Sequence, residues 1–203
     1  SPDADFLYGY RDRLDSDGRI TKLSGEFQES PTGTAELFGR MYLSHLSVCY
    51  RRALIEKVGG YDAKLRACED YELYLRMSLH TRFVPIAHAT GLRRRHGTNL
   101  SRQTGFSRRV EAEVLRRFVD RQGGAAVLDP KRVARRLFKL YYASGRQYVK
   151  ERRFRDAHAM FACAHGFGRS FKSTALQVVA LLGSVSPNRE PRRLPEIFLG
   201  LTR

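Results

Sequence analysis

The chain has 203 residues and a mass of 23.3 kDa, with 37 lysines and arginines against 21 acidic residues and a formal net charge of +16. Hydrophobic residues make up 42% of it, enough apolar surface to offset the ordering entropy of folding, which excludes a wholly disordered chain. No apolar run approaches the roughly 20 residues that cross a bilayer, and three scattered cysteines argue against a disulfide framework or a paired-cysteine zinc site.

The chain begins with the pattern of a β-hairpin. Apolar and polar side chains alternate over residues 5–13, which is typical of a half-buried strand. The turn-forming sequence DSDG follows at residues 15–18, before a second short run at residues 19–21. We therefore expect two strands joined by a tight turn.

Two short helices and a β-prone segment are predicted next. Thr34 is the expected N-cap of a helix with Leu37 on its apolar face. Residues 46–50 are mostly apolar and β-prone. Residues 52–58 indicate a two-turn helix, which ends at a pair of glycines.

A buried helix and two edge strands complete the first half of the chain. Residues 69–80 are apolar on nearly every side of a helix, a pattern that predicts burial. Residues 82–86 and 87–92 are expected to form edge strands, because Pro85 cannot donate to a central ladder.

The second half is predicted to be helical and basic. We expect helices from residue 106, from the Asp129-Pro130 start signal to residue 148, at 154–165 and at 170–182. Residues 1–104 hold 16 basic and 13 acidic side chains, whereas residues 105–203 hold 21 and 8. The sequence therefore predicts an α/β domain at 1–104 and a basic all-α extension at 105–203.

The extension contains a pattern that resembles one tetratricopeptide hairpin, at roughly residues 138–171. Small residues stand where two helices would cross, with aromatic residues between them. The positions that carry the resemblance are Gly145, Tyr148, Ala157, Phe161 and Ala164. A lone unit cannot form a solenoid, so we expect this hairpin to pack on the first half as a brace.

Glu69 and Asp70 are the strongest candidates for catalytic residues. The two carboxylates open the predicted buried helix just after a glycine-containing loop. A helix N-terminus stabilises negative charge, so Asp70 is expected to stay ionised at neutral pH and could accept a proton from a substrate hydroxyl. The alternative is that both residues only cap the helix and complement its dipole.

Four segments between residues 5 and 101 resemble, in order, the C-terminal half of the catalytic domain of family 2 glycosyltransferases, which have the GT-A fold. ADFLYG with DSDG resembles the strand and turn after the family's metal motif, and SVCYRR with IEKVGGYD resembles its "RR…GGFD" segment. CEDYELYLR resembles the "ED" helix, and RHGTNLS at residues 95–101 resembles the closing loop.

The resemblance implies an inverting transferase that moves a sugar from a nucleotide-sugar donor to an acceptor hydroxyl. Asp70 would be the general base, and Glu69 would support it or hold the acceptor. Arg95 and His96 would reach the departing diphosphate. The alternative is that neither residue has a role in binding. Arg95 would then be one member of a basic run, and His96 would be a solvent-exposed loop histidine.

The family's divalent metal, Mg or Mn, is expected for the full-length enzyme, with ligands that are not in this chain. The two Asp-x-Asp strings, Asp3 with Asp5 and Asp15 with Asp17, stand before a strand and in a hairpin turn. Neither position aims carboxylates into a cleft, so we assign no metal ligand here. The resemblance thus implies the acceptor-side half of an enzyme, expected to be inactive without the donor-binding half.

The expected partners are the nucleotide-sugar and a glycan or lipid-linked acceptor. The chain is expected in the cytoplasm, with peripheral association at the inner membrane face as an option. The apolar helix at 170–182 could rest on an anionic membrane surface, or could cap the helical bundle. The alternative function is a basic nucleic-acid-binding or helical interaction module without catalysis, although the sequence has no base-reading motif and nucleic acid is therefore not the favoured partner.

Overall fold

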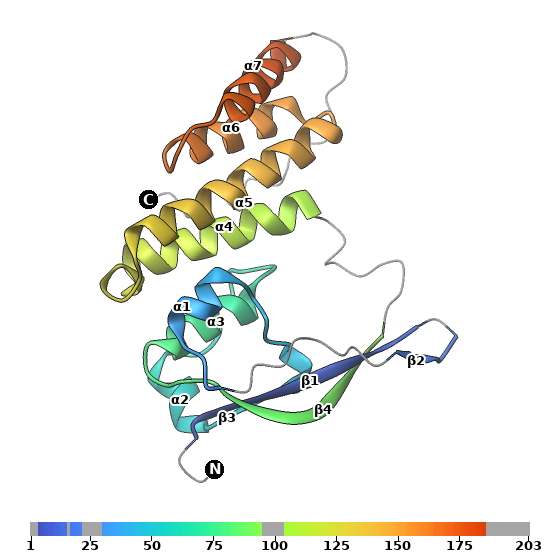
Figure 1. Ribbon diagram of the computed structural model, residues 1–203, viewed down its shortest axis with the longest axis vertical. Coiled ribbons are helices and arrows are strands. Elements are labelled where there is room, and N and C mark those ends of the chain that lie inside the picture. The colour runs from blue at the N-terminus through green and yellow to red at the C-terminus, as the bar shows by residue number, and fades with distance from the viewer. Residues whose placement is uncertain (1–3, 16, 22–29, 95–103, 186–203) are drawn as a thin grey trace.

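A computed structural model of the chain describes residues 4–15, 17–21, 30–94 and 104–185. In it a small mixed sheet lies at one end, short helices cover the sheet, and four longer helices are stacked beyond them (Figure 1). The strands are β1 (Phe6–Leu14), β2 (Ile20–Thr21), β3 (Val48–Tyr50) and β4 (Val84–Arg94). The short helices are α1 (Thr34–Gly39), η1 (His45–Ser47), α2 (Arg52–Lys57) and α3 (Glu69–Ser78).

The sheet is organised around β1. Strand β4 runs parallel to β1 along its length, with Leu7 opposite Val84 and Leu14 opposite Arg94. Strands β2 and β3 are antiparallel to β1 and pair with its two ends, β3 at the start and β2 at the finish. The predicted hairpin is confirmed, and Gly18 supplies the positive φ of +79° that its turn requires.

Three details of this region differ from the predictions. The N-cap of α1 is Gly33, not Thr34, whose hydroxyl donates instead to the carbonyl of Ser78 at 3.0 Å. The two predicted edge strands are one strand, β4, because Pro85 can continue an edge strand without donating to the ladder. The run at residues 46–50 is divided between a single 3₁₀ turn and β3.

Helix α3 is the central element of the first half. The side chains of Leu73, Tyr74 and Leu75 are fully buried, as the all-round apolar pattern predicts. The hydroxyl of Tyr71 donates to the carbonyl of Leu37 at 2.7 Å and ties α3 to α1. This anchoring fixes where the N-terminal turn of α3 presents Glu69 and Asp70.

The second half is a stack of helices, as predicted. Each helix packs on the one before it, and α4 packs on α3 (Figure 1). Asp129 caps the longest helix as expected, since its side chain accepts from the backbone N–H of Lys131. The elements are α4 (Thr104–Arg121), η3 (Gly124–Ala126), α5 (Pro130–Lys150), α6 (Phe154–His165) and α7 (Phe171–Val185).

Helices α5 and α6 form the hairpin that the tetratricopeptide-like pattern predicts. A Cβ atom built on Gly145 would lie 2.8 Å from Cε1 of Phe161, so the glycine lets the two helices approach closely. Tyr148, Ala157 and Ala164, the other positions of the pattern, are also fully buried. The buried apolar side chains form one cluster that runs from Phe6 to Ala180, so the sheet region and the helical stack share a core.

No helix within the described residues is both long enough and apolar enough to cross a membrane.

Candidate functional site around Asp70

The candidate site begins at an abrupt turn into α3. Cys68, the N-cap, has a positive φ of +58°, so the chain changes direction just before Glu69. Burial raises the pKa of the Cys68 thiol to about 12, with the charges of Glu111, Asp70 and Glu69 acting in the same direction. Cys68 is therefore a neutral thiol at physiological pH and not a nucleophile.

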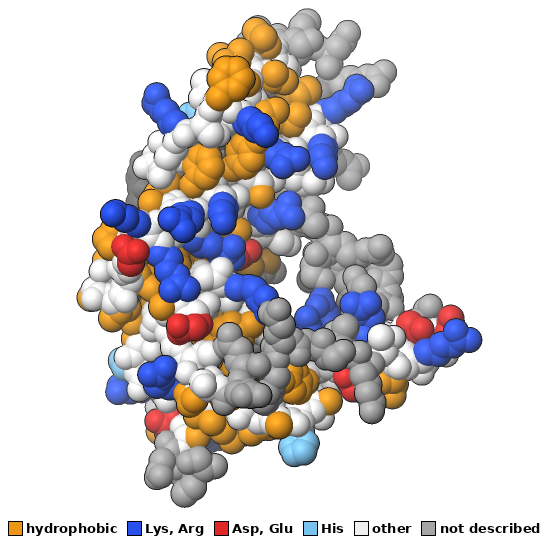
Figure 2. Space-filling view, viewed as in Figure 1, with side chains coloured by type: hydrophobic (Ala, Val, Ile, Leu, Met, Phe, Trp, Pro, Cys, Tyr) orange, Lys and Arg blue, Asp and Glu red, His pale blue; other side chains and the backbone are white. Residues whose placement is uncertain are grey.

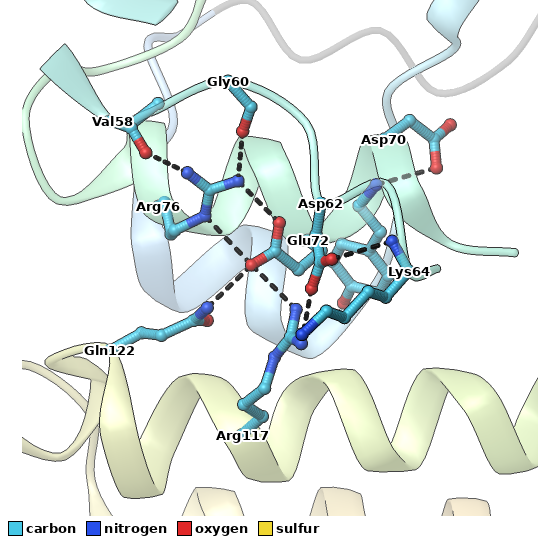
Figure 3. A network of polar contacts seen from close by, with 10 residues as sticks. Val58, Gly60, Asp62, Lys64, Asp70, Glu72, Arg76, Arg117 and Gln122 are labelled. Atoms are coloured by element: carbon cyan, nitrogen blue, oxygen red, sulfur yellow. Dashed lines mark hydrogen bonds and ion pairs between the residues drawn. The ribbon is translucent and has the colours of Figure 1, made fainter. Parts of the chain in front are cut away.

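Asp70 is half-buried in the first turn of α3, whereas Glu69 is exposed. Oδ1 of Asp70 accepts from the backbone N–H of Tyr71 at 2.7 Å. In the part of the chain that the structure describes, no lysine or arginine forms an ion pair with Asp70. Figure 3 shows its carboxylate directed away from the ion pairs farther along the helix.

Burial raises the pKa of the Asp70 carboxyl above its ordinary value, and the neighbouring charge of Glu69 acts in the same direction. The backbone N–H of Tyr71 and the charge of His45 oppose this and lower the pKa. Burial, and not the helix N-terminus, thus decides the direction of the shift. A carboxylate with a raised pKa is a stronger base than an exposed one, provided that it is ionised.

A cluster of rings adjoins Asp70, and the sequence did not reveal it. We call it the Tyr–His cluster; its members are His45, Tyr50, Tyr61 and Tyr74. Nδ1 of His45 lies 2.7 Å from the hydroxyl of Tyr74, and the hydroxyls of Tyr50 and Tyr61 are 3.2 Å apart. The rings of His45 and Tyr61 meet edge to face, with centroids 6.1 Å apart.

The Tyr–His cluster is partly accessible and electrostatically linked to the two carboxylates. Tyr61 is 41% exposed, whereas Tyr74 is fully buried beneath it. Burial raises the pKa of both phenols, and the charges of Asp70 and Glu69 raise it further. Both hydroxyls therefore stay protonated, and the surface beside Asp70 offers aromatic faces and hydroxyl groups.

Glu72, two positions after Asp70, has a structural role. It is 1% exposed, and its two oxygens accept from Nε and Nη2 of Arg76 at 2.9 and 2.7 Å (Figure 3). Arg117 of α4 lies 3.0 Å from Oε1, and the amide of Gln122, the residue after α4, donates to the same oxygen at 2.7 Å. Glu72 therefore joins the candidate site to the helical stack.

Arg76 holds the glycine-containing loop that precedes α3. Its Nη2 donates to the carbonyl of Gly60 at 2.6 Å, and its Nη1 donates to the carbonyl of Val58. Asp62, in the same loop, pairs with Arg117 at 2.7 Å. The loop and the helix that carry much of the family resemblance are thus one interlocked unit.

The other residues singled out in the sequence are two expected site residues and one aspartate to which no metal is assigned. Arg95 and His96 lie outside the described residues, so their predicted role at a diphosphate stays a prediction. Asp15 lies in the hairpin turn, where Oδ1 accepts from the backbone N–H groups of Asp17 and Arg19 at 3.0 and 2.8 Å. Among the described residues, no group of three or more His, Cys, Asp or Glu side chains could hold a metal ion.

No family model matches the chain, and no curated protein matches it.

Proposed function

We propose that this chain forms the acceptor-side part of an inverting glycosyltransferase that resembles family 2 enzymes of the GT-A fold, with Asp70 as the general base. The observation that carries the proposal is the environment of the Asp70 carboxylate. Its side chain is half-buried, accepts a hydrogen bond from the backbone, and has a raised pKa. These properties suit proton abstraction from an alcohol better than helix capping alone.

The reaction would proceed in one displacement. A carboxylate oxygen of Asp70 takes the proton of an acceptor hydroxyl. At the same time the oxygen of that hydroxyl attacks the anomeric carbon of a nucleotide-sugar from the face opposite the leaving group. The bond between the anomeric carbon and the diphosphate oxygen breaks, and its electron pair leaves with the nucleoside diphosphate. The products are the inverted glycoside, the nucleoside diphosphate and a protonated Asp70.

The surroundings of Asp70 fit a glycan acceptor. Aromatic faces and fixed hydroxyls are the groups that commonly contact the apolar and polar sides of a sugar ring. In this proposal Tyr61 and His45 line the acceptor side, and Glu69 holds an acceptor hydroxyl. Arg95 and His96 remain the proposed contacts to the diphosphate.

The described residues do not offer a set of ligands for the Mg or Mn ion that the resemblance implies. In this proposal the donor-binding half and its metal belong to a part of the enzyme other than the described residues. The steps above involve only side chains of this chain and the two substrates.

The test is nucleoside diphosphate release by the full-length protein, with a panel of UDP-, GDP- and dTDP-sugars and short oligosaccharide or polyprenyl phosphate acceptors. Asp70→Asn should lower acceptor-dependent turnover by about 10²–10⁴-fold, the usual contribution of a general base, with the donor KM unchanged. Glu69→Gln, at the carboxylate proposed to hold an acceptor hydroxyl, should mainly raise the acceptor KM and lower turnover by about tenfold or less. Full activity of Asp70→Asn would remove Asp70 as the base.

A further inference from the structure

One face of α5 carries a row of exposed cations. Lys131, Arg132, Arg135, Lys139, Arg146 and Lys150 are exposed, and we call them the basic stripe. At 3.6 residues per turn their spacing keeps all six within an arc of about 100°. The 21 residues of α5 include no aspartate or glutamate.

The basic stripe is not neutralised within the described part of the chain, where none of its six side chains forms an ion pair. This distinguishes it from Arg136, which lies outside that arc on the same helix, and from two arginines of α4. Arg136 pairs with Glu111, Arg109 with Glu113, and Arg117 with Asp62. Arg136 ties α5 to α4, Arg117 ties α4 to the loop before α3, and Arg109 pairs within α4, whereas the stripe is available to an external anion.

Helix α7 is turned so that its large apolar side chains face outward. Its inner face uses small residues: Ser173 and Ala180 are fully buried, and a Cβ atom on Gly183 would lie 2.6 Å from the ring of Phe154. Its outer face, which we call the apolar stripe, consists of Phe171, Val178, Val179, Leu181 and Leu182, which are 90, 51, 48, 47 and 68% exposed. An exposed apolar surface of this kind marks a contact with a partner or a membrane.

The two stripes belong to neighbouring helices. Helices α5 and α7 both pack on α6 and also contact each other. Figure 2 shows, on one face of the molecule, a row of lysine and arginine side chains over α5 and hydrophobic side chains beyond it over α7.

We infer that this face binds the surface of an anionic lipid bilayer, with the apolar stripe of α7 inserted at the level of the headgroups and the basic stripe of α5 against their phosphates. Charge complementarity identifies the partner, since unpaired cations beside an apolar helix face match the two layers of an anionic membrane surface. A nucleic acid would match the basic stripe but leave the apolar stripe in water. This inference does not depend on Asp70 or on transfer activity.

The chain contains no tryptophan, so one placed in the apolar stripe reports on that site alone. Phe171→Trp should shift its emission to shorter wavelength on phosphatidylcholine vesicles that contain about 30% phosphatidylglycerol, because anionic headgroups attract the basic stripe. Vesicles of phosphatidylcholine alone should give no shift. The matched control is Ile20→Trp, at a site 56% exposed on β2 and outside both stripes, which should report no change.

The basic stripe is tested by flotation with the same vesicles. Lys139→Gln with Arg146→Gln should weaken binding roughly 25-fold, at about fivefold for each cation removed. Lys57→Gln with Arg66→Gln changes the net charge equally, at two exposed positions off the stripe, and should weaken binding much less. Phe171→Ser with Leu182→Ser should also release the protein, and circular dichroism checks that each variant is folded.

Three results would overturn the inference. The first is no binding to anionic vesicles, or equal binding to neutral ones. The second is a wild-type dimer that Phe171→Ser with Leu182→Ser dissociates while vesicles are not bound, which would assign the apolar stripe to a second copy of the chain. The third is tight, salt-dependent binding of a DNA duplex in the absence of vesicle binding, which would assign the basic stripe to nucleic acid.

Discussion

Glu72 and Arg76, one helical turn apart on α3, form a two-bond ion pair from which the candidate site is assembled. The carboxylate is 1% exposed, and the guanidinium also binds the loop carbonyls of Val58 and Gly60. The same carboxylate also binds Arg117 of α4 and Gln122, the residue that follows α4. The position of Asp70 therefore depends on a neighbour that has no part in the proposed chemistry.

Replacing Glu72 with alanine should destabilise the protein strongly. Arg76 and Arg117 would lose the carboxylate that they share, and breaking a buried pair by removing one partner costs about 3–5 kcal/mol. Urea unfolding followed by circular dichroism measures the loss. Glu69→Ala removes an exposed carboxylate three residues earlier and should change the free energy of unfolding by about 0.5 kcal/mol or less. Equal midpoints for the two variants would contradict the structural role of Glu72.

Asp70→Asn should stabilise the protein at neutral pH. Because folding raises the pKa of Asp70, the folded state binds more protons than the unfolded state between the ordinary carboxyl pKa, about 3.9, and the raised value. The contribution of Asp70 to stability therefore falls as the pH rises through that window and stays unfavourable above it. Asparagine does not ionise, so the variant should gain more over wild type at pH 7 than at pH 4.

Thermal unfolding at the two pH values measures this gain. A lower melting temperature for Asp70→Asn at pH 7 would mean that the charged carboxylate stabilises the fold, as a helix cap does.

Local signals in the sequence predicted the elements well. Some signals act on the backbone next to them, so their effect can be predicted without knowing the tertiary structure. They are Asp129 before a proline, the glycine pair after α2 and the turn at residues 15–18. The start of α1 was mispredicted for the opposite reason. The hydroxyl of Thr34 is used by the carbonyl of Ser78, 44 residues away, and is not available as a cap.

The candidate site was predictable only in part. Three acidic residues within four positions open α3, and the sequence does not say which of them points inward. The i,i+4 spacing of Glu72 and Arg76 was the available signal for the buried pair. The Tyr–His cluster had no such signal, because η1, β3, the loop before α3 and α3 itself bring its members together only in the folded chain.

Asp15 is predicted to be a turn residue and not a metal ligand. Alanine at this position removes the acceptor for two backbone N–H groups and should cost about 0.5–1.5 kcal/mol for each net hydrogen bond lost, measured by urea unfolding. Asp15→Asn keeps an acceptor oxygen and should lose much less. Mn²⁺ should leave the melting temperature of wild type and of Asp15→Asn equally unchanged; a rise for wild type that Asp15→Asn abolishes would make Asp15 a ligand.

The contact between Gly145 and Phe161 provides the sharpest test of the helical hairpin. In an exposed helix interior, alanine is more favourable than glycine by roughly 0.5–1 kcal/mol. At position 145 the added methyl would lie 2.8 Å from a ring carbon of Phe161, which is fully buried and has little room to move. Gly145→Ala should therefore destabilise the protein by about 1–3 kcal/mol, the usual cost of overpacking a core.

A second substitution separates overpacking from other causes. Leucine lacks the ring atoms that the new methyl would meet, so adding Phe161→Leu to Gly145→Ala should cost less than the two single changes sum to, and a double-mutant cycle in urea measures that coupling. Additive effects would place the cost elsewhere in α5. If Gly145→Ala alone unfolds at the same or a higher urea concentration than wild type, then α5 and α6 do not cross at this glycine, and the tetratricopeptide-like spacing is a coincidence of sequence.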